Sequence, residues 1–263
     1  MARLARVAHL AGRPGVAILD RDLESLDELT GDRQRSHAMV DRLERVGRLR
    51  RVRRGAYVLV GLDGTIRVGL LDLIAAITPK PYLVTAGRAL EFHDLTDQHF
   101  RQAIVTTATQ LRPWTWRGEE VRYVRVRADL VRTTPTRTRR THARIAPPER
   151  AILDGLGHPR WGLTLPQVVR AMDLALQRHA GFADRLAAEA SALGNAALAR
   201  RAGFLVSRLV GPEAARPFRL LLGQSKAITP LRPGSPTTGS VDGSWRIRDN
   251  VGLELLMSER SSG

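Results

Sequence analysis

Five arginines stand within seven consecutive residues of the stretch VGRLRRVRRGAYVLV, which covers residues 46–60. A guanidinium group is always charged and presents a planar fork of donors that fits phosphate oxygens and the edge of guanine. From Arg42 to Arg54 the chain carries seven arginines and a single acidic residue, Glu44. Such an excess predicts a DNA-binding surface, because exposed like charges repel one another until an anion accepts them. A solvated basic edge that discourages strand pairing is the alternative interpretation.

The residues before the arginines predict a helix. Met39, Leu43 and Val46 recur at i, i+4 and i+7, so residues 33–46 are expected to form a helix that buries these three, and Gly47 is placed to end it. On a helical wheel the opposite side carries Gln34, His37, Asp41 and Arg45. An acidic side chain such as Asp41 would repel phosphate unless it accepts from a cytosine or orients a neighbouring arginine.

The residues around and after the arginines predict a β-hairpin. Residues 49–52 and 56–60 are expected to be its strands, and Gly55 supplies the backbone freedom that a tight turn needs. Apolar spacing upstream predicts a helix within residues 4–11, a brief strand at residues 16–19 and a helix within residues 23–29. This order is typical of a winged helix-turn-helix, in which the last helix enters the major groove and the hairpin is the wing. The helix and the hairpin tip are expected to form one cationic surface.

Individual side chains of this surface have different expected roles. Arg33 and Gln34, near the start of the helix, are of the types that hydrogen-bond guanine and adenine edges. His37 suits contact with DNA and exposure to solvent equally well. The candidate DNA-binding residues are Arg33, Gln34, Arg35, His37, Arg45, Arg48, Arg50, Arg51, Arg53 and Arg54.

The composition bounds the remaining possibilities. The chain has 263 residues, of which 43% are hydrophobic, and 42 basic against 26 acidic residues give a net charge of +16. The basic excess is spread along the chain, so net charge alone indicates only an affinity for polyanions. The absence of cysteine excludes disulfides and thiolate metal sites. No apolar run is long enough to span a bilayer, so a cytoplasmic protein without a membrane partner is expected.

Catalytic patterns are weak. The seven histidines are scattered without metal-binding spacing, and no Walker loop is present. The two lysines, Lys80 and Lys226, lack the paired carboxylates that a nuclease site needs. His93 and Asp94 come nearest to a catalytic pair, but neighbours in sequence converge only when a turn arranges them. The chain is therefore expected not to be an enzyme and to need no cofactor or metal.

The rest of the chain predicts a mixed architecture. Helices are expected at residues 65–76, 82–95, 149–156, 165–176, 182–191 and 196–210, with strands within residues 102–131 and a closing strand from Trp245. One face of the strands bears arginines, which fits an exposed face, an internal interface or an extension of the nucleic-acid footprint. Residues 133–148 are expected to be a solvated loop or an exposed strand. The predicted fold class is α+β, with a winged helix-turn-helix at residues 1–62 and a larger mixed α/β domain at residues 63–263.

Several segments, in order along the chain, resemble the AbiEi family. They are GRLRRVRRGAYVLV, PYLVTAGRALEFHDLTDQ, RIAPPERAILDGL, LARRAGFLVSRLVG and ITPLRPGSPTTGSVDGSWRIRDNV. The resemblance covers roughly residues 15–255. Two departures are Ala202, where a larger apolar residue is usual, and the Arg232–Pro233 pair.

The resemblance implies a function. Members of this family are antitoxins and transcriptional repressors of AbiE-type toxin–antitoxin systems. They bind inverted repeats upstream of their own operon and counteract a nucleotidyltransferase toxin encoded beside them. Duplex DNA and such a toxin are therefore the expected partners, and a monomer that associates on DNA is one of the oligomeric arrangements left open. The alternative is an RNA- or toxin-binding adaptor whose basic surface does not read duplex DNA.

Overall fold

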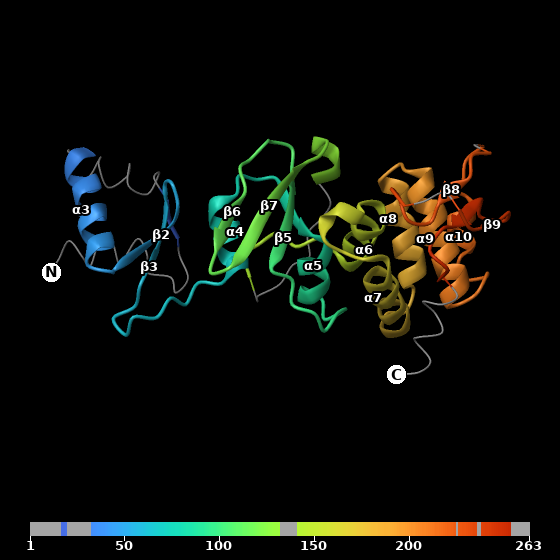
Figure 1. Cartoon of the computed structure of the whole chain (residues 1–263), viewed down its shortest axis with the longest axis horizontal. Coiled ribbons are helices and arrows are strands. Elements are labelled where there is room, and N and C mark those ends of the chain that lie inside the picture. Colours follow the sequence, from blue (N-terminus) through green and yellow to red (C-terminus); the bar gives the residue numbers. More distant parts are fainter. Residues whose placement is uncertain (1–16, 20–32, 132–140, 225, 236–237, 254–263) are drawn as a thin grey trace.

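The computed structural model describes residues 17–19, 33–131, 141–224, 226–235 and 238–253, with side chains of the first helix described from Ala38 onward. Figure 1 shows an elongated molecule in which the elements follow one another from the N-terminal helix and hairpin to the C-terminal helices. A four-stranded sheet with its helices occupies the middle. No helix in these described ranges is long and apolar enough to cross a membrane.

A helix and a three-stranded sheet make up the N-terminal part (Figure 1). They are α3 (Arg33–Arg45), β1 (Ala17–Leu19), β2 (Leu49–Arg53) and β3 (Ala56–Leu59). The sheet has the order β1-β3-β2 and is antiparallel throughout, and Gly47 and Gly55 make the two turns with φ of 70° and 72°. The predicted helix, hairpin and brief strand are thus confirmed. The two helices expected before them fall outside the described residues, so the winged helix-turn-helix stays a prediction.

The middle of the molecule is a four-stranded sheet of order β4-β5-β7-β6. Its strands and the helices beside it are α4 (Leu70–Ile77), β4 (Tyr82–Thr85), α5 (Ala86–Phe92), β5 (Gln102–Thr107), β6 (Trp114–Trp116) and β7 (Glu119–Arg125). Strands β5 and β7 are parallel and the other pairs antiparallel. The predicted strands within residues 102–131 are confirmed, and the arginine-bearing face of β7 is partly an internal interface, because Arg122 donates to the carbonyl of Arg160 at 3.2 Å.

Two predictions in this part were wrong. Residues 82–95 were expected to be one helix, but residues 82–85 form β4 and the helix begins at Ala86. All four residues of β4 are buried, and a short apolar run buried on both faces cannot be told from a helix by periodicity. Residues 133–148 were expected to be a solvated loop or an exposed strand, but their described part, residues 141–148, is only partly exposed. Ile145 and Ala146 are fully buried and pair with the outer edge of β4, with Val84 N–H donating to Arg144 O at 2.8 Å.

The C-terminal part is a group of helices followed by a small sheet of order β8-β10-β9. Its elements are η1 (Ala128–Val131), α6 (Pro148–Gly157), η2 (Pro159–Trp161), α7 (Leu165–Arg178), α8 (Phe182–Ala192), α9 (Ala196–Leu209), α10 (Arg216–Arg219), β8 (Thr229–Pro230), β9 (Ser240–Asp242) and β10 (Ile247–Asp249). The predicted helices and the closing strand are confirmed, with ends that differ by a few residues.

A buried polar network joins the central sheet to these helices. Asp154 of α6 accepts from the Thr85 hydroxyl at 2.7 Å and from Arg150 Nε at 2.9 Å. Arg150 is only 2% exposed and also donates to the carbonyl of Leu130 at 3.0 Å. A buried charge is tolerated only when it is paired and hydrogen-bonded, so this network fixes how β4, α6 and η1 meet.

Close packing at Gly203 gives a first testable prediction. A Cβ at this position of α9 would overlap the Trp245 ring and lie 2.7 Å from the Phe218 Cβ. Overpacking costs about 1–3 kcal/mol, whereas alanine adds at most about 1 kcal/mol of helix propensity. We therefore expect Gly203→Ala to lower the free energy of unfolding in chemical denaturation. Gly243→Ala is the control, because nothing lies within 4 Å of its Cβ position; equal stability of the two variants would contradict the packing.

Candidate nucleic-acid interface

Helix α3 is held on the sheet by a small apolar cluster. Val40 and Leu43 are buried, at 3% and 8% exposure, and pack with Leu49 of β2. Val46, which was expected to be buried, is 60% exposed. Helix α3 ends at Arg45, so Val46 lies beyond it, and Leu49 of β2 completes the cluster instead.

This register decides which side chains of α3 face outward. Ala38, Asp41, Arg42 and Arg45 are exposed. Arg45 and Asp41 were predicted on this face, whereas Arg42 was not among the candidates. Arg42 faces solvent because α3 is buried through Val40 and Leu43 and not through Val46. The backbone of Arg33–His37 forms the first turns of α3, but the placement of the candidate side chains Arg33, Gln34, Arg35 and His37 lies outside the described side chains.

The hairpin arginines do not share one face. Leu49 of β2 is buried toward α3, and because successive side chains of a strand alternate, Arg51 lies on the α3 side and Arg50 on the other. The Arg50 guanidinium lies over the ring of Trp116 of β6, 5.9 Å from its centroid. The expected single cationic surface is therefore wrong in this detail. Both arginines are nevertheless exposed.

The remaining hairpin arginines differ in exposure. Arg54 is exposed at the tip beside Gly55, while Arg53 is half-buried next to an irregularity in the β2–β3 register. Arg48 is half-buried and donates to the carbonyl of Gly61 at 3.3 Å, so it closes the base of the hairpin. Arg48 thus stabilises the hairpin through an internal hydrogen bond, whereas the side chain of Arg54 is accessible to a ligand.

Most of the described arginines of α3 and the hairpin have no acidic partner in the part of the chain that the structure describes. Among the described residues, no carboxylate lies within ion-pair distance of Arg42, Arg45, Arg50, Arg51, Arg53 or Arg54. Elsewhere the same residue type is neutralised internally, as in Arg88 with Glu91 at 3.0 Å and Arg185 with Glu149 at 2.7 Å. Within the described residues, these arginines of α3 and the hairpin form a positive surface, and such a surface favours anions.

A fixed turn leads from the hairpin to the rest of the chain. Gly61 N–H donates to Thr65 O at 2.8 Å, and Asp63 accepts from the backbone N–H and the hydroxyl of Thr65 at 3.0 and 2.8 Å. These bonds, with that from Arg67, lower the pKa of Asp63 to about 2. The hairpin consequently enters the middle of the molecule through a hydrogen-bonded turn at the boundary predicted from the sequence.

The catalytic-looking pair of the sequence, His93 and Asp94, lies in the turn after α5. His93 Nε2 lies 2.8 Å from the carbonyl of Ala146, and burial lowers the pKa of His93. Asp94 adopts a positive φ of 55° in the turn after α5. In the part of the chain that the structure describes, no group of three or more histidine, aspartate or glutamate residues could hold a metal ion.

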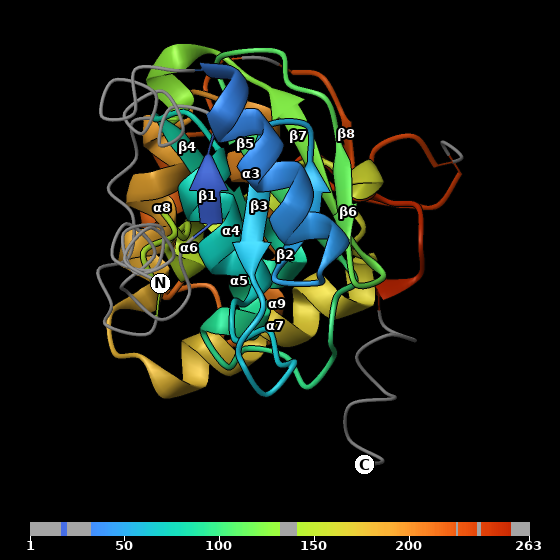
Figure 2. The same cartoon turned by 90° about the vertical axis from the view of Figure 1, so that its left-hand side faces the viewer.

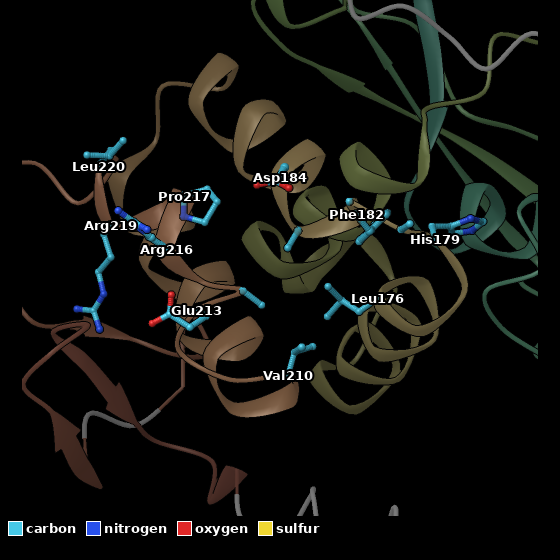
Figure 3. A pocket seen from close by; sticks show the side chains of 14 residues that line it. Leu176, His179, Phe182, Asp184, Val210, Glu213, Arg216, Pro217, Arg219 and Leu220 are labelled. Atoms are coloured by element: carbon cyan, nitrogen blue, oxygen red, sulfur yellow. The ribbon is translucent and has the colours of Figure 1, made fainter.

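A hollow at the other end of the molecule has a different character. It is lined by residues of α8 and α10, among them Asp184 and Pro217, and Figure 3 shows the side chains around it. Its volume is about 780 Å³. Val210 and Leu220 on its rim are 58% and 91% exposed. Its charged groups, Glu213 among them, are of both signs. This mixture does not select anions, in contrast to the α3 end.

The fold and this site together define an α+β chain whose N-terminal helix and hairpin carry exposed arginines, none of which has an acidic partner among the described residues. The sequence matches no protein-family model and no curated protein. Among solved structures, it is similar to the Rv2827c protein from Mycobacterium tuberculosis, with 15% identity and a TM-score of 0.70 over 97% of this chain and 93% of that one. The two chains therefore share a fold along nearly their whole lengths.

The register of α3 generates the second prediction. Leu43→Ala removes a buried side chain from the small cluster and is expected to cost about 2–5 kcal/mol of stability. Val46→Ala, at an exposed position, is expected to change stability by no more than about 0.5 kcal/mol. Chemical denaturation of the two variants, followed by circular dichroism, measures the difference. Equal losses would mean that Val46 is buried after all and that the outward face has been misassigned.

Proposed function

We propose that this protein is a DNA-binding transcriptional repressor and an antitoxin of a toxin–antitoxin operon, where it counteracts a nucleotidyltransferase toxin. The observation that carries the DNA-binding part is the set of exposed arginines on α3 and β2 that have no acidic partner among the described residues. Phosphates would neutralise these cations and release counterions into solution, which is the main source of affinity in such complexes.

The geometry of α3 and the hairpin supports different roles for the two elements in DNA binding. Exposed Arg42 and Arg45 on the outer face of α3 would accompany that helix into the major groove, where the side chains of its first turns would meet base edges. Arg51 and Arg54 on the hairpin would contact the backbone, which positions the protein without selecting a sequence. Specificity and affinity would then come from different elements.

The antitoxin part has a separate support. It rests on the ordered resemblance of five segments to the AbiEi family, whose members repress their own operon through inverted repeats. The likeness to the mycobacterial protein supports the architecture only. The middle and C-terminal parts of the chain would contain the surface that meets the toxin, and the adjacent gene would encode it.

The third prediction tests DNA binding through the hairpin. We expect the wild-type chain to bind duplex DNA from its own promoter with an affinity that falls as salt rises. Removing two phosphate contacts in an Arg51→Ala/Arg54→Ala variant should weaken binding to every duplex and reduce the slope of log affinity against log salt by about 0.9 for each contact. Fluorescence anisotropy across a salt series measures both quantities.

A matched control separates a local effect from a general loss of charge. Arg170 lies on α7, is 72% exposed and has only a long contact of 3.5 Å with Asp97, so Arg170→Gln removes one positive charge far from the hairpin. It should leave the slope unchanged. An unaltered slope in the double arginine variant would exclude Arg51 and Arg54 as phosphate contacts, and preferential binding of structured RNA in competition would favour the adaptor function instead.

A further inference from the structure

A second arginine-tipped hairpin lies beside the first. Strands β6 and β7 are joined by Arg117 and Gly118 alone, because Trp116 pairs with Glu119. The two loop residues have φ of 51° and 80°. A two-residue loop with both φ positive is the type that favours asparagine followed by glycine. Arginine at the first position holds a left-handed conformation that a residue with a Cβ and a long side chain disfavours. A residue type that disfavours the conformation it adopts points to a functional role of its side chain.

The two hairpins converge on one aromatic ring. The Arg117 guanidinium lies 5.6 Å from the centroid of Trp116, and the Arg50 guanidinium lies 5.9 Å from the same centroid. Figure 2 looks onto the α3 end of the molecule and shows β2 in front of β6, two strands that are in contact. Contact with the electron-rich face of a ring orients each cation. The arrangement therefore gathers two positive charges from segments distant in sequence.

Nothing among the described residues neutralises this pair. Neither Arg50 nor Arg117 has a carboxylate within ion-pair distance in those ranges. The two glutamates that begin β7 of the second hairpin are engaged elsewhere, Glu119 with Arg88 and Glu120 with Gln102. Trp116 is only 5% exposed, so it cannot offer its face for a base to stack on. The site thus presents cations without an aromatic platform, which suits a phosphate and not a nucleobase.

We propose that Arg50, Trp116 and Arg117 form a phosphate-binding joint, through which duplex DNA bound at α3 and the first hairpin continues over the β6–β7 hairpin. This inference rests on the proposed function and extends it, since it adds the middle sheet to the DNA contact. Trp116 is a positioning residue that holds the two guanidiniums, and the arginines contact the backbone. Because the contact is to phosphate, it adds affinity for every sequence equally.

The fourth prediction uses the turn itself. Arg117→Asn removes the charge but suits the left-handed position, so its thermal midpoint should equal or exceed that of the wild type. Its DNA affinity should fall for every duplex, and its salt slope should drop by about 0.9, the value for one phosphate contact. Arg117→Lys keeps the charge and should keep most of the slope. Anisotropy titrations over a salt series, with Arg170→Gln as the control, measure these changes.

The outcomes distinguish the joint from the function on which it rests. If the wild type binds duplex DNA and the Arg51→Ala/Arg54→Ala variant binds less well, but Arg117→Asn retains the full slope, the joint is wrong and the repressor function stands. If the wild type does not bind duplex DNA at all, the repressor function fails and the joint fails with it. A thermal midpoint of Arg117→Asn well below the wild type would also overturn the proposal, because the arginine would then be kept for stability.

Discussion

The sheet β1-β3-β2 is packed on both of its faces, and this constraint determines the side of the sheet on which Arg50 and Arg51 lie. Leu49, Tyr57 and Leu59 face α3, while Ala56 and Val58 belong to the large core that continues through α4 and the middle sheet. A strand buried on both sides cannot slip by one residue without turning its apolar set to solvent. Arg50 is consequently held toward β6 and Arg51 toward α3. The first hairpin is therefore oriented by packing before any ligand is bound.

The chain uses arginine in two opposite ways. Inside the C-terminal part the guanidinium is a structural donor, as in Arg200, which donates to the carbonyls of Leu222 and Ala227 at 2.9 Å each. Such groups are desolvated and must be satisfied by fixed acceptors. At the α3 end the guanidiniums are solvated and lack carboxylate partners among the described residues. Exposed ion pairs contribute only about 0–1 kcal/mol, so leaving these arginines unpaired costs the fold little and keeps them available to phosphate.

Sequence patterns predicted the elements around the site better than the directions of its side chains. The helix, the hairpin and the turns at Gly47 and Gly55 follow from local spacing and turn chemistry, which depend on neighbours in sequence. The burial of Val40 in place of Val46 depends on Leu49 folding back across the turn, and periodicity within the helix does not contain that contact. Strand β4 was missed for a similar reason, because its environment is created by β5 and by residues that follow η1.

At the joint between the hairpins, the residue type of Arg117 conflicts with the backbone conformation that its turn requires. The pair Arg117–Gly118 lies between two segments that alternate apolar and polar residues, so a two-residue hairpin was within reach of sequence analysis, and its first residue is a poor match for that turn. In natural proteins the conformational preference of a residue mostly agrees with the conformation it adopts in the fold. Exceptions are concentrated at functional positions. Only the structure shows that Arg117 and Arg50 contact the same ring, that of Trp116. A left-handed arginine and a second cation thus contact the same ring, and bound phosphate would give both guanidiniums an anionic partner.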